Sequence, residues 1–432
     1  MFKPHPQLVV LAAFAFALCA RPAATESQVR IVRLSDVQGG VQIDKHAGLG
    51  YENAFANLPI IQGTRLHTKE NGRAEVEFED GSTLRLAPNT TIEFSRLGSN
   101  EAGQRVSAAG LVTGRAYVNW LGKAGDEFTL TFSRQKIEVD HAAHFRVANS
   151  SGLAQVASFK NDLEVVGASE TTKVEKKKMV TFDLNADDKA TSAKNFTPDT
   201  YDEWDQQAVE YHDQYARNNS IPTGFGASDL GYYGAYSDLP GYGTVWQPYF
   251  ASTGWNPYMD GAWAWSPGLG YSWASAYPWG WMPYYYGDWT YVPNYGWGWL
   301  PGSGTVWRPG VHVLGTGAPN FQPPVVPANG MSTVVVGRGG PVVAKAPESR
   351  TFVSSGSAGL GVPRGAYGSL RHLNSQVAKS KTGSIYLPVV PQFAASAPQP
   401  LSLGSAAAAA GPSVHLPSAP SGHAPAASGG HK

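Results

Sequence analysis

The residue types that could perform chemistry are few in this sequence, and they do not converge into a known catalytic motif. His141 and His144 are three residues apart, a spacing that can hold a metal ion on a helix, but the surrounding residues predict strand and turn. On a strand, residues three apart point to opposite faces, so we do not expect the two imidazoles to share a ligand. His415, His423 and His431 are too sparse for a metal site.

Carboxylates recur at every second position in Glu75, Glu77 and Glu79. The pair of carboxylates that hydrolyses a glycoside normally converges from separate strands in a cleft, whereas these three follow one strand, so we interpret them as a solvated strand edge. Neither a GxSxG nucleophile elbow nor a phosphate-binding P-loop occurs. We therefore expect a protein that is not an enzyme, with no catalytic residues, no metal and no cofactor.

Charge and cysteine content exclude further classes of function. Lys and Arg (33) balance Asp and Glu (33), so there is no surplus of positive charge to neutralise phosphates, and we expect no nucleic-acid partner. Cys19 is the only cysteine and lies in the apolar N-terminal stretch, so its removal would leave no disulfide and no thiolate chemistry.

The N-terminus has the features of a secretory signal peptide, which we assign to residues 1–24. Lys3 precedes an uninterrupted apolar run from Leu8 to Ala20, and small residues follow it. This run is shorter than the roughly 20 residues that span a membrane, and no later stretch is more apolar, so we expect no integral membrane span in the mature chain. The expected location is the periplasm, the cell surface or the extracellular space.

Residues 27–185 predict an all-β domain. In residues 74–78 and 84–86 apolar side chains alternate with Glu75, Glu77 and Arg85, which we assign to the solvent face, and Asp80-Gly81 supplies the turn. Many such strands at short spacing favour a sandwich, roll or solenoid. Further strands are expected at residues 110–118, 128–131, 137–139, 145–147, 153–157 and 163–166.

Several motifs in this domain resemble the FecR domain over residues 29–167. They are Val37-Gln38-Gly39-Gly40-Val41, residues 63–68, Gly72-Arg73-Ala74-Glu75-Val76, residues 80–90 and residues 110–118. The resemblance implies an interaction domain, because FecR relays a transport signal across the inner membrane to a sigma factor. That relay needs a cytoplasmic helical segment and a membrane span ahead of the β domain; here the β domain follows residue 24 almost directly, so we expect no direct control of a sigma factor.

A single amphipathic helix is predicted at residues 197–217. Thr197 is the expected N-cap, Pro198 suits the first turn, and acidic residues follow it. One face of the helix carries aromatic residues three and four apart, which indicates a docking surface: Tyr201, Trp204, Ala208, Tyr211 and Tyr215.

Residues 225–309 form a Trp/Tyr/Pro/Gly-rich repeat region with eleven of the 13 tryptophans. The motif Trp255-Asn256-Pro257-Tyr258 recurs 26 residues later as Trp281-Met282-Pro283-Tyr284, and Trp265-Ser266-Pro267-Gly268 recurs as Trp299-Leu300-Pro301-Gly302 after an apparent eight-residue insertion. Trp246-Gln247-Pro248-Tyr249 is a shorter echo. Such repeats predict stacked β units. Residues 197–302 resemble an uncharacterised region that accompanies FecR domains in exported bacterial proteins.

The aromatic repeat allows two interpretations. The rings form the core of a Gly-rich fold, or some stay exposed and stack on a ligand. On the second interpretation the candidate ligand-binding residues are Trp263, Trp265, Trp273, Trp289, Trp297 and Trp299. The expected partner is then envelope polysaccharide, cell wall or another envelope protein.

Residues 310–432 predict a low-complexity, largely disordered tail, because they contain too few apolar residues to offset chain entropy. Within the tail, residues 334–336 and 342–343 suggest a strand pair, and residues 384–387 a lone strand. Three functions follow from the whole sequence. The leading one is a non-enzymatic envelope protein that binds or scaffolds. The others are a periplasmic signalling component related to FecR-type regulation of transport and an accessory protein of an envelope hydrolase.

Overall fold

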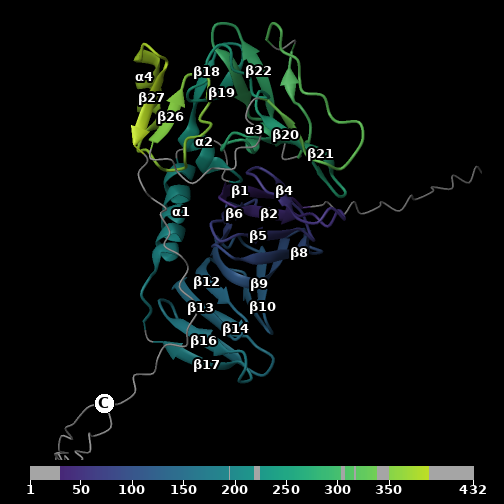
Figure 1. Ribbon diagram of the computed structural model, residues 1–432, viewed down its shortest axis with the longest axis vertical. Coiled ribbons are helices and arrows are strands. Elements are labelled where there is room, and N and C mark those ends of the chain that lie inside the picture. Colours follow the sequence, from purple (N-terminus) through teal and green to yellow (C-terminus); the bar gives the residue numbers. More distant parts are fainter. Residues whose placement is uncertain are drawn as a thin grey trace, which may run out of the picture.

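The computed structural model describes residues 30–193, 195–217, 224–302, 307–315, 318–337 and 350–388. The predicted signal peptide, Cys19, residues 342–343 and the three C-terminal histidines lie outside these ranges. Figure 1 shows a β domain (residues 30–193) below and a Trp-rich module (the described residues from 224 to 388) above, with helix α1 (Thr200–Ala216) running alongside. Among the helices of the described ranges, none is long and apolar enough to cross a membrane.

The β domain consists of strands only, as the alternating pattern predicts. Its pairing continues beyond the predicted boundary at residue 185, because β16 pairs along its whole length with β17. The seventeen strands are β1 (Val32–Gln38), β2 (Val41–Asp44), β3 (Glu52–Asn53), β4 (Pro59–Ile60), β5 (Arg65–Thr68), β6 (Arg73–Glu77), β7 (Thr83–Leu86), β8 (Thr91–Ser99), β9 (Arg105–Trp120), β10 (Glu127–Phe132), β11 (Gln135–Val139), β12 (Ala143–Asn149), β13 (Leu153–Lys160), β14 (Leu163–Val166), β15 (Thr171–Val174), β16 (Met179–Asp183) and β17 (Lys189–Ala193).

The long strand β9 belongs to two sheets. Residues 105–113 pair with β8, and residues 114–120 pair with β12, so the strand passes from one sheet to the other between Thr113 and Gly114. Gly114 has a φ of +94°, and a Cβ at this position would collide with the backbone and side chain of Thr90. A side chain is therefore excluded where the strand changes sheets.

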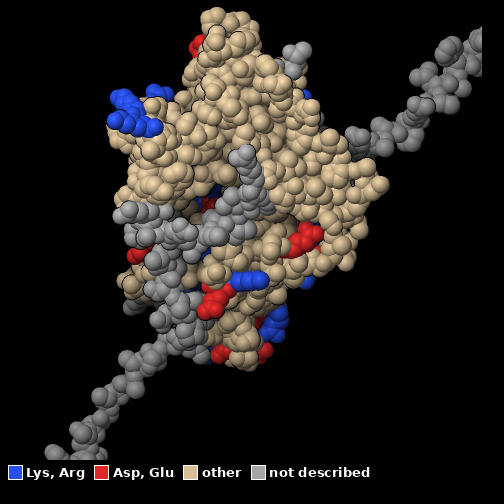
Figure 2. Space-filling model, turned by 45° about the horizontal axis from the view of Figure 1, so that its top comes forward, with Lys and Arg blue, Asp and Glu red and all other residues tan. Residues whose placement is uncertain are grey.

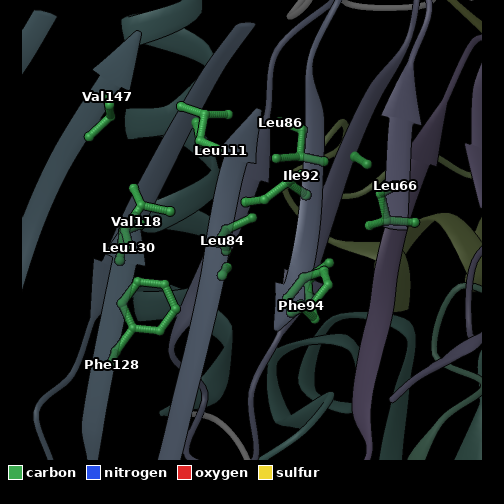
Figure 3. Packing of buried hydrophobic residues seen from close by; sticks show 14 of the residues in the cluster. Leu66, Leu84, Leu86, Ile92, Phe94, Leu111, Val118, Phe128, Leu130 and Val147 are labelled. Atoms are coloured by element: carbon green, nitrogen blue, oxygen red, sulfur yellow. The ribbon is translucent and has the colours of Figure 1, made fainter. Parts of the chain in front are cut away.

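The two sheets enclose an aliphatic core. Figure 3 shows Leu84 and Val118 from one sheet lying close to Ile92 and Leu130 from the other. The buried residues are mostly Val, Leu, Ile, Phe and Ala, supplied at every second position of the strands. This core supports the mainly β fold that the sequence predicts.

Helix α1 is present but starts three residues later than predicted. Its N-cap is Asp199, not Thr197: the Asp199 carboxylate accepts from the backbone N–H groups of Tyr201 and Asp202, and Asp202 accepts in return from the Asp199 N–H. Pro198 thus precedes the cap instead of occupying the first turn. This reciprocal capping box satisfies N–H groups that lack partners within the helix.

Up to residue 336, the Trp-rich module contains short helices and two small sheets. One sheet has the order β18-β19-β23-β22-β24 and the other β21-β20-β25. The elements up to residue 336 are α2 (Ala227–Tyr233), β18 (Gly234–Leu239), β19 (Gly243–Pro248), β20 (Gly261–Ser266), β21 (Gly270–Ser275), α3 (Met282–Tyr285), β22 (Asp288–Val292), β23 (Gly296–Leu300), β24 (Val313–Leu314) and β25 (Val334–Val336).

Pairing registers correct the predicted alignment of the repeats. In the hairpin β20–β21 Trp263 lies opposite Trp273, and in β22–β23 Trp289 lies opposite Trp299, so both pairs keep the 26-residue offset. The sequence motif had paired Trp299 with Trp265, which required an eight-residue insertion. Trp299 is instead the second copy of Trp273, so the predicted insertion is wrong. Trp246 lies on β19, the second strand of the hairpin β18–β19, and so corresponds to Trp273 instead of Trp255.

The described part of the C-terminal region is folded from residue 350 to residue 388, contrary to the prediction of a largely disordered tail there. β26 (Arg350–Ser354) pairs with β27 (Ser384–Pro388), and α4 (Leu370–Lys379) lies between them in sequence. Val353, Val362 and Val377 are buried against the aromatic residues of the module. Residues 350–388 need few apolar residues of their own, because aromatic residues between positions 211 and 299 supply the rest of this core. Residues 384–387 are thus not a lone strand, and residues 334–336 pair with β20.

Candidate functional site: a buried ionic joint

The polar face of the sheet that contains β1, β6 and β7 is buried. The prediction that Glu75 and Glu77 lie on a solvated strand edge is therefore wrong. Glu75 and Glu77 on β6 and Arg85 on β7 do alternate with apolar residues, but they are at most 3% exposed. Arg33 on β1 lies opposite Glu77 and is fully buried. Glu79 follows the strand and pairs with Arg30 at 2.7 Å. Buried charges of this kind are costly unless each one is paired.

The covering elements bring the missing partners. Asp205 of α1 accepts from Arg85 at 2.8 Å, and Asp229 of α2 pairs with Arg33 at 2.7 Å. Arg364, which precedes α4, connects the β domain to the Trp-rich module. It donates to Glu75 of the β domain at 2.9 Å and to Asp229 of the module at 2.6 Å. We call this network the ionic joint; it comprises Arg33, Glu75, Glu77, Arg85, His144, Asp205, His212, Asp229 and Arg364.

Two histidines complete the joint. His144 on β12 lies 2.5 Å from Asp205, and His212 on α1 lies 3.0 Å from Glu75. The joint therefore sets four carboxylates against three guanidinium groups and two imidazoles. The three guanidinium groups thus face four carboxylates, and each imidazole lies against one of these carboxylates.

The pKa values follow from burial and from these pairs. Burial alone would raise the pKa of Glu75, but His212, Arg85 and Arg364 outweigh it and hold that pKa well below the usual range. Arg364 and Arg33 likewise overcome burial and lower the pKa of Asp229. For Glu77 burial prevails over Arg33, and its pKa is raised. The two glutamates on β6 thus have opposite shifts.

Ser228, which lies next to the joint, forms with His212 and Glu75 the order of a nucleophile, a base and an acid. Ser228 Oγ lies 2.8 Å from His212 Nδ1, and Glu75 contacts His212 Nε2. Ser228 is only 2% exposed, however, and the Glu75 carboxylate is shared with Arg85 and Arg364. A substrate has no access to this hydroxyl in the structure, so we interpret the contacts as structural.

Helix α1 adds a second set of contacts to the β domain at its N-terminal end. Asp202 accepts from Arg146 at 2.6 Å and from the Tyr117 hydroxyl at 2.9 Å. Asp199 accepts from Arg115 at 2.5 Å. Tyr201 and Trp204 pack on the same sheet, beside Tyr117 and Ala87. This end of the predicted aromatic stripe docks on the β domain.

The C-terminal end of the same helix docks on the module. Tyr211 and Tyr215 contact Tyr232 of α2, and the Tyr211 hydroxyl donates to Asp229 at 2.8 Å. Ala208, between the two ends, is half-buried. The helix therefore spans both parts, and Figure 2 shows acidic and basic atoms at the bottom of a hollow between them.

The six tryptophans that the sequence suggests for ligand binding are almost all internal. Five of them are at most 2% exposed: Trp263, Trp273, Trp289, Trp297 and Trp299. Trp265 is half-buried. The equivalent rings Trp263 and Trp289 are both fully buried, as expected if the repeat forms a core. Stacking on a ligand needs an exposed face, which these five rings do not offer.

His141 and His144, whose spacing we considered for metal binding, contact different residues. His141 is exposed and pairs with Asp140, whereas His144 points into the ionic joint. Within the described ranges, no group of three or more His, Cys, Asp or Glu side chains is arranged to hold a metal ion.

Sequence reasoning missed most of the ionic joint. A usable signal was the strand face itself, because Glu75 lies directly opposite Arg85 in the β6–β7 hairpin. Asp205 and His212 follow buried aromatic residues of α1 by one position. Arg364 gave no local signal, since it lies in a Gly- and Pro-rich segment that shows no periodicity.

Comparisons with known proteins divide the chain in the same way. Residues 64–164 match the family described as FecR protein, and residues 227–322 match a family of unknown function (DUF6600). The first match lies inside the β domain and the second inside the Trp-rich module. A search of the curated proteins finds no match.

Two crystal structures of a protein provisionally assigned as an anti-sigma factor, from Parabacteroides distasonis, resemble part of the chain. Both are 16% identical to it, with a TM-score of 0.28. They cover 34% and 35% of this chain and 71% and 72% of their own chains. A TM-score this low does not establish a shared fold.

Proposed function

Because residues 64–164 form a FecR domain, followed by an uncharacterised family region at residues 227–322, we propose that this chain is a non-catalytic signalling protein of the FecR type. It would work in the cell envelope, after export, by binding another protein. The FecR match carries this proposal. It favours the signalling function, which the sequence ranked second, over the general binding or scaffolding function that it ranked first.

The ionic joint supports a role in which the two parts act as one body. Charges from β1, β6, β7, β12, α1, α2 and the segment before α4 meet there, and seven of the nine residues are at most 6% exposed. A partner that displaces the module or helix α1 would uncover several paired charges at once. Because these ion pairs are broken when the parts separate, a partner that binds one part meets both as one body.

Recognition of glycan or cell wall by the aromatic repeat is the weaker candidate. Of the six tryptophans suggested for it, only Trp265 is more than 2% exposed, and one half-buried ring offers little stacking surface. We keep a polysaccharide ligand as an alternative outcome of the test below.

Deleting the gene and measuring all transcripts tests the proposal. A signalling protein should change a defined set of transcripts, and the full chain supplied in trans should restore them. The variant Arg364→Leu should restore them less well than the control Arg371→Leu, whose side chain is exposed on α4. Unchanged transcripts, together with retention of the purified chain on cell-wall fractions, would instead support the polysaccharide alternative.

A further inference from the structure

Residues 322–327 form an apolar segment on the surface of the Trp-rich module. Val325 is 87% exposed, more than any other large hydrophobic residue in the described part of the chain, and Val326 is 49% exposed. Every third residue from position 321 to position 327 is half-buried, and the residues between them are exposed. A period of three is that of a polyproline II helix, in which every third side chain lies on the same side.

The sequence of this segment imposes the extended conformation. Three of its six residues are prolines, whose ring fixes φ at about −65°, and the residue before each proline is restricted to extended backbone. The chain is also held on both sides of the segment. The Phe321 ring lies 4.7 Å from the Trp297 ring between centroids, and the Ser332 carbonyl accepts from the Tyr271 hydroxyl at 3.1 Å. The segment is therefore preformed, so little conformational entropy is lost when a partner binds it.

A pair of exposed aromatic rings lies elsewhere on the module. Phe352 on β26 and Tyr386 on β27 are directly opposite each other in the hairpin, and they are 49% and 68% exposed. Their ring centroids are 5.0 Å apart, and the ring planes are tilted by 48°. Thr351 and Val353 on either side of Phe352 are buried, so the alternation of the strand points the two rings away from the core.

The apolar segment and the ring pair match each other chemically. Domains that bind polyproline II segments use surfaces lined by aromatic rings. The carbonyl groups of such a segment have no partners within it, and the Tyr386 hydroxyl is a donor that could pair with one of them. Figure 1 places β26 and β27 on the opposite side of the module from β20, which pairs with β25 just after the segment. The ring pair of the same chain is therefore out of reach, and the occupant that fits is a second copy.

We propose that residues 322–327 of one copy bind the Phe352–Tyr386 pair of a second copy. Pro323 and Val326, three positions apart and hence on one side of the segment, pack on the two rings, and the neighbouring Val325 extends the contact. Because this contact joins two different surfaces and every copy carries both, copies link head to tail. The inference goes beyond the proposed signalling function and does not depend on it.

Analytical ultracentrifugation of the full chain over a series of concentrations tests the proposal. The contact is small, so the association is weak, and the average mass should rise steadily with concentration. The free peptide Ac-Phe-Gln-Pro-Pro-Val-Val-Pro-Ala-NH₂, which copies residues 321–328, should lower that mass. The same peptide with aspartate in place of the first valine should leave the mass unchanged. A wild-type chain that stays monomeric at every concentration overturns the proposal.

Two variants each remove one surface. Val325→Asp and Tyr386→Ser should both weaken self-association at least about tenfold, because the first buries a charge without a partner and the second removes a ring. Both replaced side chains are exposed, so circular dichroism should show folded proteins. The control Leu49→Asp introduces the same charge at a 45% exposed position of the β domain and should associate like wild type. An equal loss in the control counts against the proposed surfaces.

A mixture of the two variants distinguishes this contact from a symmetric one. The Val325→Asp protein keeps the ring pair, and the Tyr386→Ser protein keeps the apolar segment. An equimolar mixture should therefore form a one-to-one dimer and nothing larger. If the mixture associates no better than either variant alone, the segment and the rings do not bind each other and the proposal is refuted.

Discussion

The β domain and the Trp-rich module reach full burial with different side chains. The β domain packs Val, Leu, Ile and Phe between two sheets, whereas the module packs Trp and Tyr around short hairpins. Aliphatic side chains carry no polar atoms, but each indole brings an N–H group. Trp246 and Trp279 donate to the carbonyl oxygens of Leu230 and Ala358, while Trp263 has no acceptor among the described residues.

The aromatic core also requires glycine at specific places. Gly234, Gly261 and Gly287 each begin or precede the first strand of a hairpin, and each lies against the tryptophan of the facing strand. A Cβ on any of them would collide with that ring. Large rings thus fill the module because glycines make room for them, which explains why its Gly and Trp contents rise together.

The ionic joint connects the two cores, and breaking it should have the largest effect. Arg85→Leu leaves Glu75 and Asp205 buried without this partner, and we expect unfolding to become easier by about 3–5 kcal/mol. Chemical denaturation followed by tryptophan fluorescence and by circular dichroism measures the change. Arg65→Leu, which removes a partly exposed pair with Glu93, should cost at most about 1 kcal/mol. Similar losses in the two variants would contradict the importance of burial.

The aliphatic core predicts the next effect. Phe78 is 1% exposed and contacts Trp120 and Phe128, so Phe78→Ala should reduce the free energy of unfolding by about 3–5 kcal/mol through the cavity it leaves. Leu49→Ala, at a 45% exposed position, is the control and should change stability by no more than about 0.5 kcal/mol. A loss below about 1 kcal/mol for Phe78→Ala would show that the core collapses around the gap.

The aromatic core predicts a smaller loss from added volume. A Cβ at Gly261 would lie 2.5 Å from the Trp273 ring, so Gly261→Ala should cost about 1–3 kcal/mol in thermal unfolding. Gly254→Ala in the same module, where a Cβ meets nothing within 4 Å, is the matched control. If both variants melt alike, the glycines do not serve to admit the rings.

The free energy of unfolding at low pH should report on the carboxylates of the ionic joint. The folded-state pKa of Glu75 is depressed, so its contribution to stability is present above its unfolded pKa, near 4.5, and is lost as the pH falls through the folded value. Asp229 acts in the same direction, while Glu77, with a raised pKa, opposes it. Stability measured from pH 7 downwards should therefore fall below about pH 4.5, and less steeply in Glu75→Gln. An identical slope in that variant would exclude Glu75 as a source.

Local patterns predicted the elements well. Period-two alternation located the strands around Phe78 and Leu84, and the aromatic spacing of residues 201–215 located the docking helix. Alternation states which side chains share a face, but it does not state what covers that face. The assignment of Glu75 and Glu77 to solvent failed for this reason.

The candidate site depended on contacts between distant segments. Glu75 meets Arg364 across 289 positions, and no local pattern records such a pairing. The register of the repeat failed for a related reason: Trp265 and Trp299 share the motif Trp-x-Pro-Gly, but strand pairing places Trp299 with Trp273. Motif similarity is therefore a weaker guide than the hairpin geometry.

Arg364 also bears on the order in which the protein is completed. A ribosome adds roughly 5–20 residues per second, so Arg364 follows Glu75 by on the order of 15–60 s of synthesis. During that interval Glu75 lacks one of its guanidinium partners, and the Asp229 carboxylate of the module lacks the same one. The joint is therefore completed only by a segment near the other end of the chain, and we expect truncation before residue 364 to leave Glu75 and Asp229 without this partner and to make the contact between the two parts easier to open to proteases.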